Sequence, residues 1–237
     1  MKPFICKVTG VFFSYAAWAL GIILARSQSW RMWEFKGSSI SMVFIGLWEA
    51  SYFQTFNISG SLIELPVHAK INQSWVIPEE IRYGQDMILL ANTMKSVVLV
   101  FGSLALLINW VNSQYAEFLR TYYKLSACFL LVSCASTVSS VIWNFSVDTY
   151  GQSTLQFPRH FPVRTEMIVK RHFSYTLPLG ITTGSISLVS ASLFLSEFCY
   201  VKQTAQVRPL EAVPKQLPRE APAFGAGCLE GNPTPTQ

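Results

Sequence analysis

The chain of 237 residues is apolar: 51% of its residues are hydrophobic, 14% are aromatic and only 13% are charged. A soluble domain carries about 25% charged residues, so this composition indicates a membrane protein. The formal net charge of +5 is not gathered into a dense basic patch, which argues against nucleic acid as a partner. The five cysteines lack metal-ligand spacing, and none falls in the two long polar stretches.

Four apolar runs are long enough to cross a bilayer as helices. They cover residues 8–25, 87–110, 125–143 and 173–198. At about 1.5 Å per residue, the shortest run spans roughly 27 Å. For the first run a cleaved signal peptide is the alternative, but its length and its bulky aromatic residues favour a retained helix.

Three of these runs contain features that concern helix packing. Lys95 is the one charged residue of the second run, and we interpret it as a lysine that snorkels to the nearer interface. An intramembrane partner or pathway residue is the alternative. The third run is rich in serine, and the fourth contains Gly180 and Gly184, a spacing that favours close packing within a bundle.

The first polar stretch, residues 26–86, is expected to form a small antiparallel sheet. Strand-like patterns cover residues 41–45, 51–56 and 62–65, and Pro66 should end the last of them. Two glutamates that follow Pro78 predict the start of the second helix.

The second polar stretch, residues 144–172, has a Pro- and aromatic-rich centre at Phe157–Pro162. We expect this centre to form an exposed apolar loop tip, because exposed aromatic clusters often mark interaction sites. Packing onto the sheet or onto the membrane interface is the alternative.

The sequons favour an extracellular position for both polar stretches. Asn57 and Asn72 are candidate glycosylation sites, whereas the sequon at Asn144 is expected to lie too close to the lipid. Basic residues in the short link and at the flanks favour cytoplasmic termini. Residues 201–237 are Pro-rich and are expected to form a disordered tail. Cys199 is a palmitoylation candidate, with an ordinary buried thiol as the alternative.

Trp30, a spacer and then Gly46-Leu47-Trp48 form a pattern that resembles the signature of the claudin family, within the peripheral myelin protein and claudin superfamily. The resemblance covers residues 1–200. It supports a membrane α+β fold: a four-transmembrane helix bundle with a small extracellular antiparallel β-sheet from the two outer loops. The signature residues would scaffold the first loop. If Trp30 and Trp48 anchor it at the interface, replacing either by Ala reduces surface delivery.

The chain departs from the family pattern at the signature cysteines. Ser51 stands where the first would be, and the second falls at Gly60, Ser61 or Leu62. Gln85 replaces a family arginine. The C-terminal Thr-Pro-Thr-Gln lacks an apolar last residue, which argues against capture in a PDZ groove.

The resemblance implies a structural protein of cell–cell (tight) junctions, acting in adhesion and in the paracellular barrier or permeability. Its partners would be itself and other claudins, in cis and in trans, together with membrane lipid. It would be a multi-pass protein of the plasma membrane. The alternative is an auxiliary tetraspan subunit or trafficking partner of a membrane channel or receptor. The candidate adhesion contacts are aromatic: Tyr52, Phe53, Phe157 and Phe161. No catalytic constellation is recognisable, so neither an enzyme, a cofactor nor a metal is expected.

Overall fold

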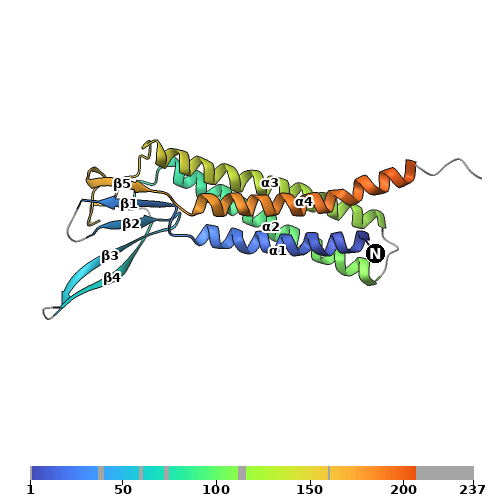
Figure 1. Ribbon diagram of the computed structural model, residues 1–237, viewed down its shortest axis with the longest axis horizontal. Helices are drawn as coiled ribbons and strands as arrows, with labels where there is room; N and C mark the ends of the chain where they lie inside the picture. Colours follow the sequence, from blue (N-terminus) through green and yellow to red (C-terminus); the bar gives the residue numbers. More distant parts are fainter. Residues whose placement is uncertain are drawn as a thin grey trace, which may run out of the picture.

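The computed structural model describes residues 2–36, 40–58, 61–71, 75–111, 116–159 and 161–206. Four long helices run side by side, and one five-stranded antiparallel sheet lies at one end of them (Figure 1). The start of α1 and the end of α4 lie at the other end (Figure 1). The expected combination of four helices with an antiparallel sheet is therefore confirmed.

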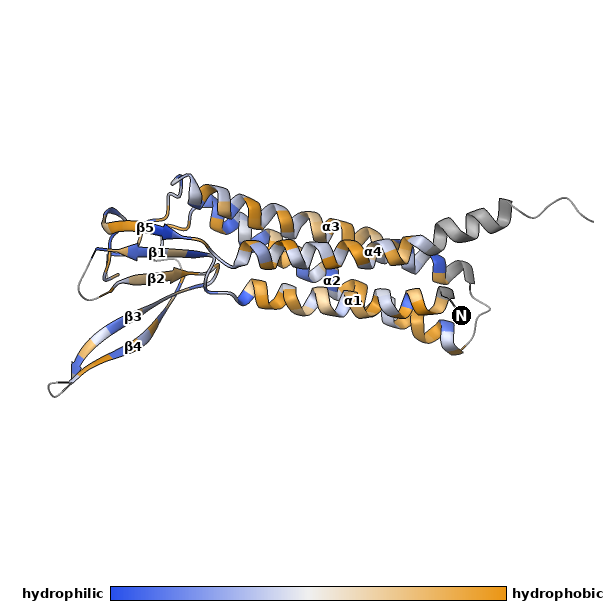
Figure 2. Ribbon diagram, in the orientation of Figure 1, coloured by the Kyte–Doolittle hydropathy of each residue, from blue (hydrophilic) through white to orange (hydrophobic). Residues whose placement is uncertain are grey.

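The helices are α1 (Lys2–Arg26), α2 (Glu79–Val111), α3 (Ala116–Thr149) and α4 (Thr176–Gln206). Each contains a stretch that is long and apolar enough to cross a membrane. Figure 2 shows apolar residues along all four helices. The first three expected spans lie within α1, α2 and α3, whereas the fourth was expected to begin at residue 173, three residues before α4 begins. The helices extend further at most ends because polar residues continue the helical turns.

Two boundaries bear on the predictions. Helix α2 begins at Glu79, as the proline and the acidic first turn predict. Helix α4 continues to Gln206, so the expectation of disorder from residue 201 is wrong for its first six residues. They continue a helix that the apolar run has already formed, and Pro209 is the first residue that would break it. Residues 207–237 lie outside the described residues.

Small and hydroxyl side chains bring the helices together. Ser133 and Ser140 of α3 donate hydrogen bonds to backbone carbonyl oxygens of α2, at 3.0 and 3.4 Å. Gly180 and Gly184 of α4 lie against valines of α3, and a Cβ at either position would collide with them. The predicted role of both patterns in close helix packing is confirmed.

Lys95 lies inside the bundle, so the interpretation that it snorkels to the interface is wrong. Its side chain is 1% exposed, and Nζ donates to Oγ1 of Thr137 on α3 at 3.4 Å. Gly21 of α1 is adjacent, because a Cβ there would come within 3.0 Å of the ammonium group. Snorkelling requires a position on the lipid-facing surface, whereas Lys95 occupies the face of α2 turned towards its neighbours.

The sheet has the strand order β4-β3-β2-β1-β5. The first polar stretch supplies four strands and the second supplies one. The strands are β1 (Arg31–Phe35), β2 (Met42–Ile45), β3 (Glu49–Ile58), β4 (Ser61–Lys70) and β5 (Ile168–His172). Both polar stretches therefore contribute to one sheet, as expected.

Strands β3 and β4 form a long hairpin that bends away from the other strands (Figure 1). Strand β2 pairs with β3 no further than Tyr52. Beyond that residue, β4 is the only neighbour of β3 within the described sheet. We call residues 53–58 of β3 and residues 61–66 of β4 the distal hairpin.

Pro66 lies within β4 and does not end it, contrary to the prediction. The backbone N–H of Ile71 donates to the carbonyl oxygen of Trp48 at 2.9 Å. Odd-numbered residues of β4 therefore bond to β3, and even-numbered residues face the open edge. Pro66 falls among the latter, so its missing N–H breaks no ladder bond. It removes a donor from the open edge, which hinders pairing with a further strand.

Candidate interaction surface

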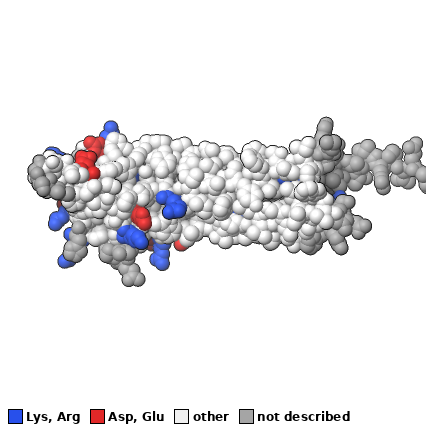
Figure 3. Space-filling model, turned by 90° about the horizontal axis from the view of Figure 1, so that it is seen from below, with Lys and Arg blue, Asp and Glu red and all other residues white. Residues whose placement is uncertain are grey.

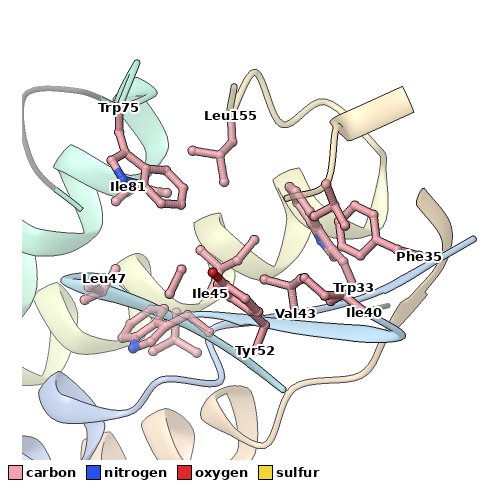
Figure 4. Close-up of a cluster of buried hydrophobic side chains, with 14 of the residues drawn as sticks. Trp33, Phe35, Ile40, Val43, Ile45, Leu47, Tyr52, Trp75, Ile81 and Leu155 are labelled. Carbon is pink, nitrogen blue, oxygen red and sulfur yellow. The ribbon is translucent and has the colours of Figure 1, made fainter. Parts of the chain in front are cut away.

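One face of the sheet covers a hydrophobic core. The side chains of Trp33, Val43 and Ile45 are buried there. Figure 4 shows Ile81 of α2 and Leu155 of the second polar stretch approaching these strands. Side chains from both polar stretches thus share one core with the first turn of α2, which positions the sheet on the bundle.

Phe157 and Phe161 belong to this core and do not form the expected exposed tip. Their rings stack on each other with centroids 4.6 Å apart. Phe161 also meets the edges of Tyr52 at 5.2 Å and of Trp75 at 5.3 Å. The prediction of an exposed tip is wrong because the apolar face of the sheet needs a cover, and aromatic rings bury a large area there. Burial likewise raises the pKa of the Tyr52 phenol.

The signature residues lie where the sheet meets the bundle. Trp30 is buried, and its indole N–H donates to the carbonyl oxygen of Leu24 at 3.1 Å. Leu47 is also buried. At Gly46, a Cβ would come within 2.8 Å of a backbone oxygen, so only glycine fits between the chain that leaves α1 and strand β3. Trp48 is 39% exposed. Burial removes the interface-anchor explanation for Trp30, whose role in this structure is packing.

Gln85 ties helix α2 to the same turn. Its side-chain amide donates to the carbonyl oxygen of Leu47 at 2.6 Å. Glutamine, which stands here in place of the family arginine, therefore links the second helix to the Gly-Leu-Trp turn through its side chain.

A buried polar network, which the sequence did not predict, joins β1 to the helix ends. Arg31 is 1% exposed, and it donates to Oγ of Ser153 at 2.8 Å and to Oδ1 of Asn144 at 3.3 Å. The carboxylate of Glu80 lies 3.6 Å from the guanidinium and accepts a hydrogen bond from Ser153 at 3.0 Å. Burial lowers the pKa of Arg31, and the charges of Glu80 and Asp148 oppose that change.

The network continues towards strand β5. The indole of Trp33 donates to Oδ1 of Asp148 at 2.8 Å. Arg171 donates to the backbone carbonyl of Asp148 at 2.7 Å, and its guanidinium lies 5.5 Å from the centre of the Trp33 ring. Gly151 has a φ of +69°, and a Cβ there would come within 3.0 Å of Arg171. These contacts fix β1 and β5 to the end of α3.

The modification candidates lie in different surroundings. Asn57 is exposed on β3. Asn144 is buried within α3 and donates to the carbonyl oxygen of Ser140 at 3.1 Å, so it is structural. Asn72 lies outside the described residues, as does the side chain of Cys199.

Ser51 faces His68 across the hairpin. Two positions at which the second signature cysteine would fall pair elsewhere, since Ser61 faces Ile58 and Leu62 faces Asn57. The side chains of Gln28 and His68 are 3.4 Å apart at Nε2 and Nδ1. Ser51 and His68 border a shallow groove of about 250 Å³.

The distal hairpin carries large exposed apolar side chains on both faces. On the face that continues the sheet core, Phe56, Ile63 and Leu65 are 37%, 42% and 44% exposed. On the opposite face, Phe53 and Leu62 are 51% and 74% exposed. Phe53 is thus the exposed member of the four candidate adhesion residues. Apolar side chains gathered on a projecting hairpin form a surface that a partner can bury.

Charged side chains gather at the sheet end of the molecule, and the adjoining face of the helices is almost without them (Figure 3). Within the described part of the chain, no group of three or more His, Cys, Asp or Glu residues could hold a metal ion. Comparison of the chain with protein-family models and with curated proteins found no match. The four apolar helices indicate a multi-pass membrane protein, and its candidate surface is the distal hairpin.

Proposed function

We propose that this protein is a claudin-like structural protein of cell–cell junctions that associates with itself through the distal hairpin. The observation that carries the proposal is the exposure of Phe53, Phe56, Ile63, Leu62 and Leu65 on a hairpin at the end away from the start of α1. With cytoplasmic termini, the hairpin projects from the outer surface of the cell. Burying its apolar area against a facing copy stabilises the contact by about 25 cal/mol per Å².

The signature pattern supports the family assignment. Trp30, Gly46 and Leu47 hold the first polar stretch to the bundle, and Gln85 bonds to the same turn. The hairpin does not depend on the family disulfide at Ser51, because β3 and β4 pair without interruption along their whole length.

The composition of the distal hairpin favours a barrier over an ion path. Glu64 is the one charged side chain among its described residues. Selective ion paths require rings of charge or of backbone carbonyl groups. Pro66 hinders strand pairing at the open edge, so the contact forms through the side-chain faces.

The proposal is tested in cells that have no junctions of their own. Two cell populations are mixed, and the tagged protein is expressed either in both populations or in only one of them. We expect enrichment at contacts between two expressing cells and none at contacts with a non-expressing cell. The double variant Phe53→Ser and Leu62→Ser should lose the enrichment. A matched control is Val76→Ser with Val169→Ser, which removes two exposed apolar side chains outside the hairpin and should retain it.

A uniform surface signal would contradict the proposal. If a channel or receptor then co-purified with the protein, the auxiliary-subunit function would replace the junctional one. Equal enrichment of the hairpin variant and its control would show that the contact lies elsewhere on the sheet end.

A further inference from the structure

A groove lies between the first turns of α2 and the last turns of α3, beside the sheet. Its volume is about 480 Å³, within the range of small-molecule sites. The side chains that line it come from these two helices and the segment after α3. They are Glu79, Glu80, Tyr83, Trp143, Val147 and Gln152. Among the contacts described above between the sheet and the bundle, none involves Tyr83, Trp143 or Glu79.

Two aromatic rings form one wall of the groove. The centroids of Tyr83 and Trp143 are 6.3 Å apart, and the rings are inclined by 59°. Both side chains are exposed, Trp143 to 54%. Inclined, accessible ring faces attract a cation that lies within about 6 Å of a ring centre.

The charge of the groove is complementary to a cation. Glu79 is exposed, and Glu80 is already neutralised by Arg31. None of the described residues that line the groove is basic, and Arg82 on the same helical turn is not among them. One uncompensated carboxylate beside two aromatic rings is the composition that recognises quaternary ammonium groups.

The depth of the groove matches a lipid headgroup. Tyr83 lies four residues after the start of α2, or about 6 Å along the helix axis. Trp143 is six residues before the end of α3. Both therefore lie at the boundary between the apolar spans and the polar sheet, where Trp and Tyr meet headgroups.

We propose that this groove binds the quaternary ammonium headgroup of a choline phospholipid, with Trp143 and Tyr83 as the ring faces and Glu79 as the counter-charge. The methyl groups of choline pack on the rings, whereas the smaller ammonium of an ethanolamine lipid keeps its water and its hydrogen bonds. The acyl chains extend along the apolar surfaces of α2 and α3. This site does not depend on the proposed junctional function.

The test uses the full chain in a maltoside detergent that contains no choline. It is titrated with dihexanoyl-phosphatidylcholine below its micelle concentration, and binding is followed by the shift of the unfolding temperature. Dihexanoyl-phosphatidylethanolamine is the matched lipid. We expect the choline lipid to bind at least about fivefold more tightly. Trp143→Leu and Glu79→Gln should each weaken choline-lipid binding by about fivefold, and Trp110→Leu at the far end of α2 should leave it unchanged.

Equal binding of the two lipids would overturn the proposal, as would equal binding by Trp143→Leu and Trp110→Leu. If Trp143→Leu does not fold, Glu79→Gln decides the question, because Glu79 is exposed. Wild-type affinity of that variant for the choline lipid would then overturn the proposal.

Discussion

The two halves of the β3–β4 hairpin have similar sequence patterns and different surroundings. Near the bundle, Tyr52 and Val67 face each other and pack into the core, under Phe161. Further out, Phe56 and Ile63 face each other on the same side of the sheet, and both are exposed. The difference comes from the second polar stretch, whose aromatic side chains cover the hairpin only as far as Tyr52. We call residues 49–52 and 67–70 the covered half, and the distal hairpin is the uncovered half. The same alternating apolar pattern therefore contributes to stability where other side chains cover it. Where no side chains cover it, the exposed apolar residues are free to bind a partner.

The largest effect should follow from a change in the core that the covered half shares with β1. Trp33→Ala should lower the free energy of unfolding by about 3–5 kcal/mol, because it leaves a cavity and removes the hydrogen bond to Asp148. Denaturant titration in detergent micelles measures this. Trp48→Ala is the control. Because Trp48 is partly exposed, this variant should lower the free energy of unfolding by less than half as much. Equal losses would show that the core does not hold the sheet as described.

The next effect concerns the charges beneath the covered half. Glu80→Gln should lower the free energy of unfolding by about 3 kcal/mol, because the buried Arg31 loses its nearest carboxylate. The same titration measures it. The neighbouring Glu79→Gln changes an exposed carboxylate and should stay within about 0.5 kcal/mol of the native chain. If Glu80→Gln left the free energy of unfolding unchanged, the buried Arg31 would not depend on this partner.

A disulfide within the covered half, one pair from its boundary with the distal hairpin, should stabilise the hairpin. Ser51 and His68 form a pair without mutual ladder bonds, whose Cα atoms lie about 4.5 Å apart, within the range of disulfides. Ser51→Cys with His68→Cys should therefore cross-link on oxidation and raise the free energy of unfolding by about 2–3 kcal/mol. Thiol alkylation under denaturing conditions detects the cross-link. Ser51→Cys with Ser61→Cys should remain reduced. A cross-link in this variant, with none between the cysteines at positions 51 and 68, would contradict the observed register.

The smallest effect on stability should follow from changes in the uncovered half. Phe53→Ser and Leu62→Ser should each alter the free energy of unfolding by no more than about 0.5 kcal/mol, because both side chains are largely exposed. Denaturant titration measures this. A loss of 2 kcal/mol or more would show, by the usual size of core effects, that the distal hairpin is packed and not free to bind.

Composition and periodicity predict the four helices, because a span through lipid needs a long apolar run and little else. The strand-like patterns at residues 41–45, 51–56 and 62–65 also predict β2 and parts of β3 and β4. Strand β1 was not predicted, because Arg31 occupies an inward position and hides the alternation of Trp33 and Phe35. Inward burial of an arginine depends on Glu80 and Asn144, which come from distant parts of the chain.

The site was less predictable than the fold. Whether an aromatic residue covers a core or projects from it depends on tertiary distance, so Phe157 and Phe161 gave no local sign of burial. The same applies to Lys95, which faces neighbouring helices. The length of the hairpin was missed because Pro66 is a strong break signal in a sequence, although it is tolerated at the outward positions of an edge strand.

The most direct measurement of self-association uses two populations of vesicles that carry the purified protein and differ in a fluorescent lipid. We expect protein-dependent clustering of the two populations when both contain the native chain. The clustering should fall at least about tenfold when one population carries Phe53→Ser with Leu62→Ser, whose lost apolar contact area corresponds to 1.4 kcal/mol or more. Vesicles with Val76→Ser and Val169→Ser should cluster as the native protein does. Clustering that is unchanged by the hairpin variant would contradict the assignment of the distal hairpin as the contact surface.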